Sequence, residues 1–255
     1  TTLSGGEALP NLNVLSGTTT VNNQVITING ATNITGSLVN LTGANAKTFT
    51  GLVTINSGGV LDLSTVTAPA VNFGAGIVNN SDATNSFRVG GAATLVGNIS
   101  GSGTGGFNFQ SSLTISSGTT TNSYTAGALG VTIDGTFTLT GHWTQGAGTT
   151  LYYGSTNAIA GAGTLDASTN LNTINYDFAG VQTVKVITYR NLTLSGSGVK
   201  TAATTPTVNG VLSMEGTATI TVTTGVVTYG SSGTLQYNTT TARNSSSEEW
   251  ITTFN

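Results

Sequence analysis

The stretch Thr173 to Gly216 reads TINYDFAGVQTVKVITYRNLTLSGSGVKTAATTPTVNGVLSMEG. Its short runs place a β-branched or aromatic residue at every second position, which is the pattern of half-buried strands. These runs are Thr173–Tyr176, Thr183–Tyr189 and Leu192–Leu194. Between them stand residues that let the backbone turn at little steric cost, namely Ala179-Gly180, Ser195-Gly196-Ser197-Gly198 and Asn209-Gly210. We therefore predict a chain of short strands separated by tight corners.

The opening of this stretch recurs along the chain, first after a short interval and then after a much longer one. The three copies are Thr150-Leu151-Tyr152-Tyr153, Thr173-Ile174-Asn175-Tyr176 and Thr234-Leu235-Gln236-Tyr237. A weaker pattern, an aliphatic residue followed by polar residues and glycine, occurs at irregular intervals as Ile28-Asn29-Gly30, Ile55-Asn56-Ser57-Gly58, Ile115-Ser116-Ser117-Gly118, Ile133-Asp134-Gly135 and Val208-Asn209-Gly210. Recurring strand patterns indicate stacked repeats, and the irregular spacing indicates repeats of unequal length.

Composition narrows the class of protein further. Only 6% of the 255 residues are charged, against roughly 25% in a typical soluble domain, while 37% are apolar. Valine, isoleucine and threonine are abundant, and no stretch keeps helical periodicity for about 10 to 12 residues. The net charge is −3 and the six basic residues are scattered along the chain, so no basic patch could neutralise a phosphate backbone. This argues against a nucleic-acid partner. No apolar run approaches the roughly 18 to 20 residues of a transmembrane segment, and cysteine is absent.

Two all-β architectures fit these observations. Tandem β-sandwich repeats are the alternative, but short strands with Gly and Asn corners favour a parallel β-helix or β-solenoid with coils of about 20 to 25 residues and on the order of a dozen rungs. We expect residues 1–255 to form a single solenoid segment, less regular over 65–106. The best-defined unit is 173–233, and a next copy begins near Thr234. Because the pattern continues to the last residue, we expect the segment to belong to a longer repetitive protein.

The last third of the chain resembles a known class of repeats. The order of its motifs is similar to that in the repeats of very large secreted or cell-surface adhesin-like proteins of Gram-negative bacteria. These motifs are Gly180, Gln182-Thr183, Tyr189 to Gly198, Lys200-Thr201 and Thr207 to Gly210. The resemblance is strongest over residues 173–255 and compositional elsewhere. It implies a secreted or cell-surface location, export of the type IX kind, and contacts with other segments of the same long chain, with surface glycans or with neighbouring cells. No sorting domain lies in this segment.

Candidate catalytic groups are sparse. The nine acids are Glu7, Asp62, Asp82, Asp134, Asp166, Asp177, Glu215, Glu248 and Glu249, and the adjacent pair would point to opposite faces of a strand. Asp62, Asp82, Asp134 or Asp166 could still stack across coils, so a polysaccharide lyase or hydrolase of the β-helix type stays an alternative. His142 is the single histidine, and we expect His142-Trp143 to be a strand edge with a packed indole. The run Gly101–Gly106 lacks the lysine of a phosphate loop, and we expect a loop. We predict no catalytic, cofactor or metal site.

Threonine arrays offer the candidate ligand face. Threonines alternate with smaller or aliphatic residues at Thr217, Thr219, Thr221 and Thr223. A flat face of this kind binds ice or a crystalline polysaccharide when it is regular enough. The alternative is that threonine is simply a good β-former for the solvent-exposed face of a strand. Aromatic rings that could stack on sugars, or instead staple neighbouring rungs, are Tyr152, Tyr153, Tyr176, Tyr189 and Trp250. The function expected is a non-catalytic stalk or adhesin segment.

Overall fold

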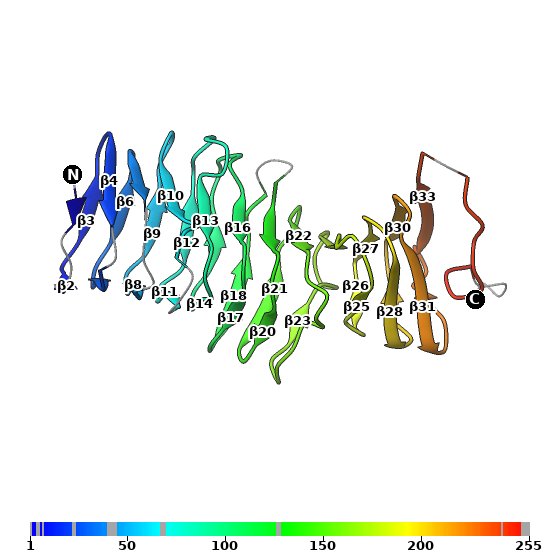
Figure 1. Cartoon of the computed structure of the whole chain (residues 1–255). Coiled ribbons are helices and arrows are strands. Elements are labelled where there is room, and N and C mark those ends of the chain that lie inside the picture. Colours follow the sequence, from blue (N-terminus) through cyan, green and yellow to red (C-terminus); the bar gives the residue numbers. More distant parts are fainter. Residues whose placement is uncertain are drawn as a thin grey trace.

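The computed structural model describes residues 2–3, 6, 8–21, 24–39, 45–66, 70–125, 129–240 and 242–250. Within these residues the chain forms only β-strands and no helix, and every pair of neighbouring strands is parallel. The strands stack coil upon coil into an elongated solenoid, with the N-terminal coils at one end and the C-terminal coils at the other (Figure 1). The predicted fold class, an all-β parallel solenoid, is confirmed.

One sheet runs through the whole stack, and we call it the long sheet. In spatial order its twelve strands are β1 (Thr2–Leu3), β4 (Thr18–Val21), β7 (Ser37–Val39), β10 (Val60–Leu63), β13 (Phe87–Val89), β16 (Phe107–Phe109), β19 (Val131–Ile133), β22 (Thr150–Tyr153), β24 (Thr173–Tyr176), β27 (Asn191–Leu194), β30 (Val211–Glu215) and β33 (Thr234–Asn238). Each strand pairs with the strand of the next coil.

Two further sheets complete the N-terminal coils, residues 2–166. The second sheet contains β2 (Ala8–Leu9), β5 (Ile26–Ile28), β8 (Lys47–Phe49), β11 (Val71–Phe73), β14 (Ala93–Leu95), β17 (Leu113–Ile115) and β20 (Phe137–Leu139). The third contains β3 (Leu12–Val14), β6 (Thr32–Ile34), β9 (Val53–Ile55), β12 (Ile77–Asn79), β15 (Ile99–Ser100), β18 (Thr119–Asn122), β21 (His142–Gln145) and β23 (Leu165–Asp166). Each complete coil therefore contributes one strand to each of three sheets.

The C-terminal coils, residues 167–238, keep the long sheet but replace the other two. The fourth sheet consists of β25 (Gln182–Val184), β28 (Val199–Thr204) and β31 (Thr219–Thr224), and the fifth of β26 (Thr188–Tyr189), β29 (Thr207–Val208) and β32 (Thr228–Tyr229). A single bridge between Ala167 and Tyr189 lies at the change from the third sheet to the fifth. The cross-section of the solenoid thus changes while one ladder continues.

Coil length varies widely along the long sheet. The coil that brings Thr173 opposite Asn191 is short, whereas the coil that brings Leu61 opposite Phe87 is considerably longer. The recurrent strand opening marks this sheet: Thr150 lies opposite Thr173 in the neighbouring coil, and Thr234 begins β33 three coils later. The short interval between copies of the opening is therefore one coil, and the long interval is three coils.

The weaker pattern has a different meaning. Its aliphatic residues end strands of different sheets, with Ile28 in the second sheet, Ile55 in the third, Ile133 in the long sheet and Val208 in the fifth. The polar residues and glycine that follow form the corner. The pattern marks corners on any face, and this is why its spacing is irregular.

The interior is made by alternation. In a typical three-residue strand the first and third side chains are buried and the middle one faces outward, as in β9, β14 and β19. Each buried aliphatic side chain contributes roughly 1.5–3 kcal/mol relative to exposure, and stacked coils share that burial. Phenylalanines stack inside the N-terminal coils, where Phe49 lies parallel to Phe73 with ring centroids 5.4 Å apart.

Two sequence predictions need correction. The run Thr183–Tyr189 is not one strand: β25 ends at Val184 and β26 begins at Thr188, because the backbone of Lys185 turns inward to bond two buried tyrosine hydroxyls. Residues 65–106 contain more regular coil than predicted, with β11 to β15 lying in order on three sheets. Gly101–Gly106 is a loop, as predicted. Pro69 lies outside the described residues.

Candidate functional site

The predicted threonine face exists on the fourth sheet. Thr217 lies in the turn before β31, and Thr219, Thr221 and Thr223 point outward from it, all exposed, while Ile220 and Val222 between them are buried. The register adds a column that the sequence did not reveal, because Thr183, Thr201 and Thr221 lie side by side on three successive coils. We call these residues, Thr183, Thr201, Thr219, Thr221 and Thr223, the threonine face.

The threonine face is regular and uncharged. Neighbouring coils are about 4.8 Å apart, and outward residues along one strand are about 6.7 Å apart. Lys200, the cation of β28, points inward and is fully buried. Its ammonium donates to the carbonyl of Phe178 and, at 3.1 Å, to the side-chain oxygen of Gln182. A surface with hydroxyls and methyls but no charge can contact a neutral, repetitive ligand and has nothing to attract an ion.

Three of the five predicted ring residues do not reach the surface. Tyr153, Tyr176 and Tyr189 are fully buried, and the hydroxyls of Tyr176 and Tyr189 lie 3.0 Å apart inside the C-terminal coils. Burial raises the pKa of the Tyr176 phenol to about 12, and burial also raises the pKa of the Tyr189 phenol well above its usual value. The prediction that these rings are exposed to a ligand is wrong, because Tyr153, Tyr176 and Tyr189 point into the interior from β22, β24 and β26. Tyr176 packs edge-on against Tyr153 of the preceding coil, in line with the alternative interpretation that the rings staple neighbouring rungs, whereas its contact with Tyr189 lies within one coil.

The other two ring residues are accessible but lie elsewhere. Tyr152 is half-buried on the outer face of the long sheet, opposite Asn175 of the next coil. Trp250 is half-exposed and follows the last strand. Neither belongs to the fourth sheet, so Tyr152 and the threonine face do not share one sheet surface.

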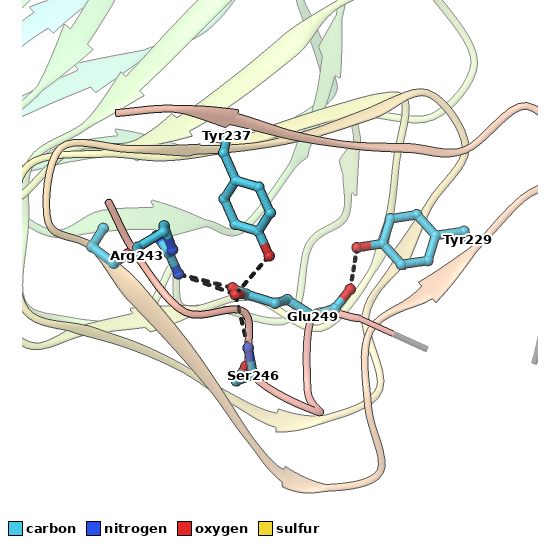
Figure 2. Close-up of polar contacts among 6 residues, drawn as sticks. Tyr229, Tyr237, Arg243, Ser246 and Glu249 are labelled. Atoms are coloured by element: carbon cyan, nitrogen blue, oxygen red, sulfur yellow. Dashed lines mark hydrogen bonds and ion pairs between the residues drawn. The ribbon is translucent and has the colours of Figure 1, made fainter. Parts of the chain in front are cut away.

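The residues after β33 form a polar cluster that the sequence did not predict. We call residues 242–250 the strap. The carboxylate of Glu249 is completely buried and accepts from Arg243 Nη2 at 3.0 and 3.2 Å, from the Tyr237 hydroxyl at 3.0 Å and from the Ser246 amide at 3.0 Å (Figure 2). The Tyr229 hydroxyl donates to the Glu249 carbonyl at 2.6 Å. One acid thus ties the strap to the last coil.

A pocket lies where the strap meets the threonine face. Its volume is about 250 Å³, and it is lined by Gly216, Thr217, Thr219, Ala242, Arg243 and Asn244. Arg243 also donates through Nη1 to the carbonyl of Ala218 at 2.6 Å. Nothing in the sequence pattern pairs residue 243 with residue 218, because the strap leaves the strand repeat.

Most of the acids have structural roles. Asp62 forms an ion pair with Arg88 of the next coil; burial alone would raise the pKa of its carboxyl, but hydrogen bonds from Ser64 and Arg88 lower it. Asp82 accepts from the amide and hydroxyl of Thr104, and Asp166 accepts from residues 168 and 169. These carboxylates close corners. Glu7 lies outside the described residues.

Asp134 and Asp177 are brought together, which the sequence had not paired. Both follow strands of the long sheet, two coils apart, with Gly154 between them, and a methyl group on Gly154 would lie 3.0 Å from Asp134 Oδ1 and 3.5 Å from Asp177 Oδ1. Burial raises the pKa of both carboxyls, and Asp134 raises that of Asp177 further. No group of three or more His, Cys, Asp or Glu that could hold a metal ion occurs among the described residues.

His142 and Trp143 lie where they were predicted. They begin β21, where the indole is fully buried and packs edge-on against Phe137, with centroids 5.3 Å apart. The indole N–H donates to Gln145 Oε1 at 2.8 Å, and His142 Nδ1 lies 2.6 Å from the Thr164 hydroxyl. The single histidine is therefore bonded to a corner threonine of the next coil.

Comparisons with known proteins give no family. No family model matches the chain, and neither a curated protein nor a solved structure matches it. Among the described residues, no helix has the length and apolar character needed to cross a membrane.

Proposed function

We propose that this chain is a non-catalytic structural segment, a stalk, of an exported bacterial surface protein. The observation that carries the proposal is the long sheet, whose parallel ladder continues through twelve strands although the other sheets change. Because each coil is hydrogen-bonded to the next and shares its apolar interior, bending would break ladder bonds and expose buried side chains. The chemistry of such a segment is mechanical: it holds the groups attached to it apart.

Stiffness can be measured directly. The chain has no cysteine, so Asn13→Cys and Gln236→Cys, both at exposed positions of the first and last coils, allow two spin labels to be attached selectively. Eleven intervals between long-sheet strands place the two coils about 50 Å apart. Because the two labels lie on different sheets, we expect a narrow distance distribution centred somewhat above this separation. A broad distribution would contradict a stalk.

The surface location rests on the resemblance of residues 173–255 to repeats of large exported adhesin-like proteins. Antibodies against the chain should label intact cells of the organism that carries it, and external protease should remove the label. Labelling that appears only after the cells are permeabilised would contradict export.

A second candidate function is favoured by the threonine face. The column Thr183, Thr201 and Thr221, together with Thr219 and Thr223, forms a neutral array that suits ice or a crystalline neutral polysaccharide. Thermal hysteresis and pull-down on insoluble glycans test both ligands. Thr219→Tyr/Thr221→Tyr should abolish such binding, whereas Thr114→Tyr on the second sheet should not.

The catalytic alternative concerns Asp134 and Asp177. An enzyme acting on uronate polymers would release reducing or unsaturated ends. We expect no release by the wild-type chain. If the wild-type chain released such ends and Asp177→Asn did not, the chain would be a polysaccharide-cleaving enzyme and the stalk proposal would be wrong.

A further inference from the structure

The last strand of the fourth sheet has an unusual edge. β31 has the sequence TITVTT, is one of the two longest strands, and pairs through one side only, with β28. It carries no charge and no proline. Edges of folded sheets are normally protected by such residues, because an unprotected edge offers its free backbone groups to another strand.

The register shows which backbone groups face outward. The Thr219 amide donates to the Gly198 carbonyl at 3.0 Å, toward β28. Alternate residues of a strand bond to the same side, so Thr221 and Thr223 also face β28, while the N–H and C=O groups of Ile220 and Val222 face away from it. In the described part of the chain, no backbone hydrogen bond joins these two residues to another element on that side.

The outward edge is complementary to itself. If two β31 strands met antiparallel with Thr221 at the two-fold axis, Thr219 would lie opposite Thr223, and Ile220 opposite Val222. The pair Ile220 and Val222 would exchange both hydrogen bonds, as alternate pairs of an antiparallel ladder do. Outward threonines would meet threonines, and inward aliphatic residues would meet aliphatic residues. A second copy of β31 meets all of these conditions at once, and two copies related in this way form an isologous dimer.

The strap lies over this end of the solenoid. Arg243 bonds the Ala218 carbonyl just before β31, and the Glu248 carbonyl accepts from the Val227 amide just after it. Between these two points the strap leaves the pocket beside Thr217 and Thr219 instead of pairing with β31 as another strand would. The strap therefore occupies the place of the next coil without forming its ladder.

Besides the backbone anchors at Ala218 and Val227, hydrogen bonds from Arg243, Tyr237 and the Ser246 amide converge on the buried Glu249 carboxylate (Figure 2). Docking of the strap also leaves Arg243 Nε and Ser246 Oγ buried without a hydrogen-bond partner. Because each of these atoms loses its hydrogen bonds to water without a replacement, each opposes docking of the strap. We propose that the outer edge of β31 is a self-association surface for a second copy of this chain, and that the strap, locked by Glu249, keeps the edge covered.

The experiment compares full-length variants by sedimentation velocity over a wide range of protein concentration. The wild-type chain should be a monomer. Glu249→Ala and Arg243→Met should release the strap and give a concentration-dependent dimer, with a dimer dissociation constant at least about tenfold below that of the wild type. Asp62→Asn breaks the ion pair with Arg88, which lies away from this end, and should stay monomeric.

Strap release is read independently by trypsin, because Arg243 is a cleavage site that lies within the strap. Mass spectrometry should find rapid cleavage after residue 243 in Glu249→Ala and slow cleavage in the wild type. If Glu249→Ala leaves this cleavage unchanged, the carboxylate does not lock the strap and the proposal fails.

The edge is tested in the released background. Adding Thr221→Lys places two ammonium groups face to face at the two-fold axis and should return Glu249→Ala to a monomer. Thr183→Lys adds the same charge to the same face two coils away and should leave the dimer intact. Mixing the Thr221→Lys and Thr221→Glu forms should restore it. A released strap with no dimer, a wild-type dimer, or a dimer insensitive to Thr221→Lys would each overturn the proposal.

Discussion

The N-terminal and C-terminal coils share one ladder but fill their interiors differently. Around Phe87 the rings of Phe73, Phe107 and Phe109 lie with centroids 5.0–5.6 Å away. From the end of the N-terminal coils into the C-terminal coils, Tyr153, Tyr176 and Tyr189 pack edge-on and use their hydroxyls to bond backbone groups. The comparison teaches that a continuous sheet can enclose either stacked phenylalanines or tyrosines, and that the hydroxyls of these three buried tyrosines all have hydrogen-bond partners.

The largest effect is expected in the phenylalanine stack. Phe87→Ala removes a fully buried ring that contacts three others, and the rigid ladder on either side prevents the cavity from closing. We expect a loss of about 3–5 kcal/mol in the free energy of unfolding. Denaturant titration measures it, and Phe87→Leu should recover much of the loss. A loss below about 1 kcal/mol would show that the stack is not tightly packed.

A smaller effect is expected in the tyrosine cluster. Tyr176→Phe keeps the ring but removes the hydroxyl that accepts from the Lys185 amide at 3.0 Å and bonds Tyr189. The partly buried amide loses its partner, so we expect a loss of about 1–3 kcal/mol. Hydrogen exchange at Lys185 should accelerate at the same time. Unchanged exchange would mean that the hydroxyl does not hold this corner.

The paired carboxyls predict a weaker, pH-dependent effect. Because Asp134 and Asp177 have raised pKa values in the folded chain, the folded state binds more protons, and their contribution to stability is present at low pH and lost as pH rises through the folded pKa. Relative to Asp134→Asn/Asp177→Asn, the wild-type melting temperature should therefore rise as pH falls from about 7 toward the unfolded value near 4. Asp62→Asn serves as the control of opposite sign, since the pKa of Asp62 is lowered.

The smallest expected effect is that of salt. In the described residues only Arg88–Asp62 and Arg243–Glu249 form ion pairs, and the second is buried. Screening acts mainly on exposed charges, so the melting temperature should change little between low and high ionic strength. A strong shift of the melting temperature in either direction would show that charge interactions contribute more to stability than these two ion pairs indicate.

Much of the fold could be predicted because its rules are local. Alternation of side chains along a strand and glycine at corners are visible in a few residues, as in Thr173–Tyr176. The change of cross-section at Ala167 could not be predicted, since it depends on which coils lie opposite each other. For the same reason, the sequence could not show that residues 183, 201 and 221 form one column.

The candidate site was harder to predict because exposure depends on which way a strand faces. Tyr152 and Tyr153 are neighbours, yet one lies on the outer face of the long sheet and the other in the interior. Tyr176 follows Tyr153 in register and is buried with it. The strap was invisible to pattern analysis, because Arg243 and Glu249 belong to no repeat and meet only through the fold.

The unequal coils have a consequence for how such a molecule changes. The short coil from Thr173 to Asn191 and the long coil from Leu61 to Phe87 advance the ladder by the same single step. Residues inserted at a corner therefore change the cross-section of the solenoid and leave its length along the axis unchanged. Duplication of a whole coil instead lengthens the solenoid without disturbing the neighbouring coils. The number of coils therefore sets the distance between the two ends of the molecule, and the corners can acquire new surface residues while that distance stays constant.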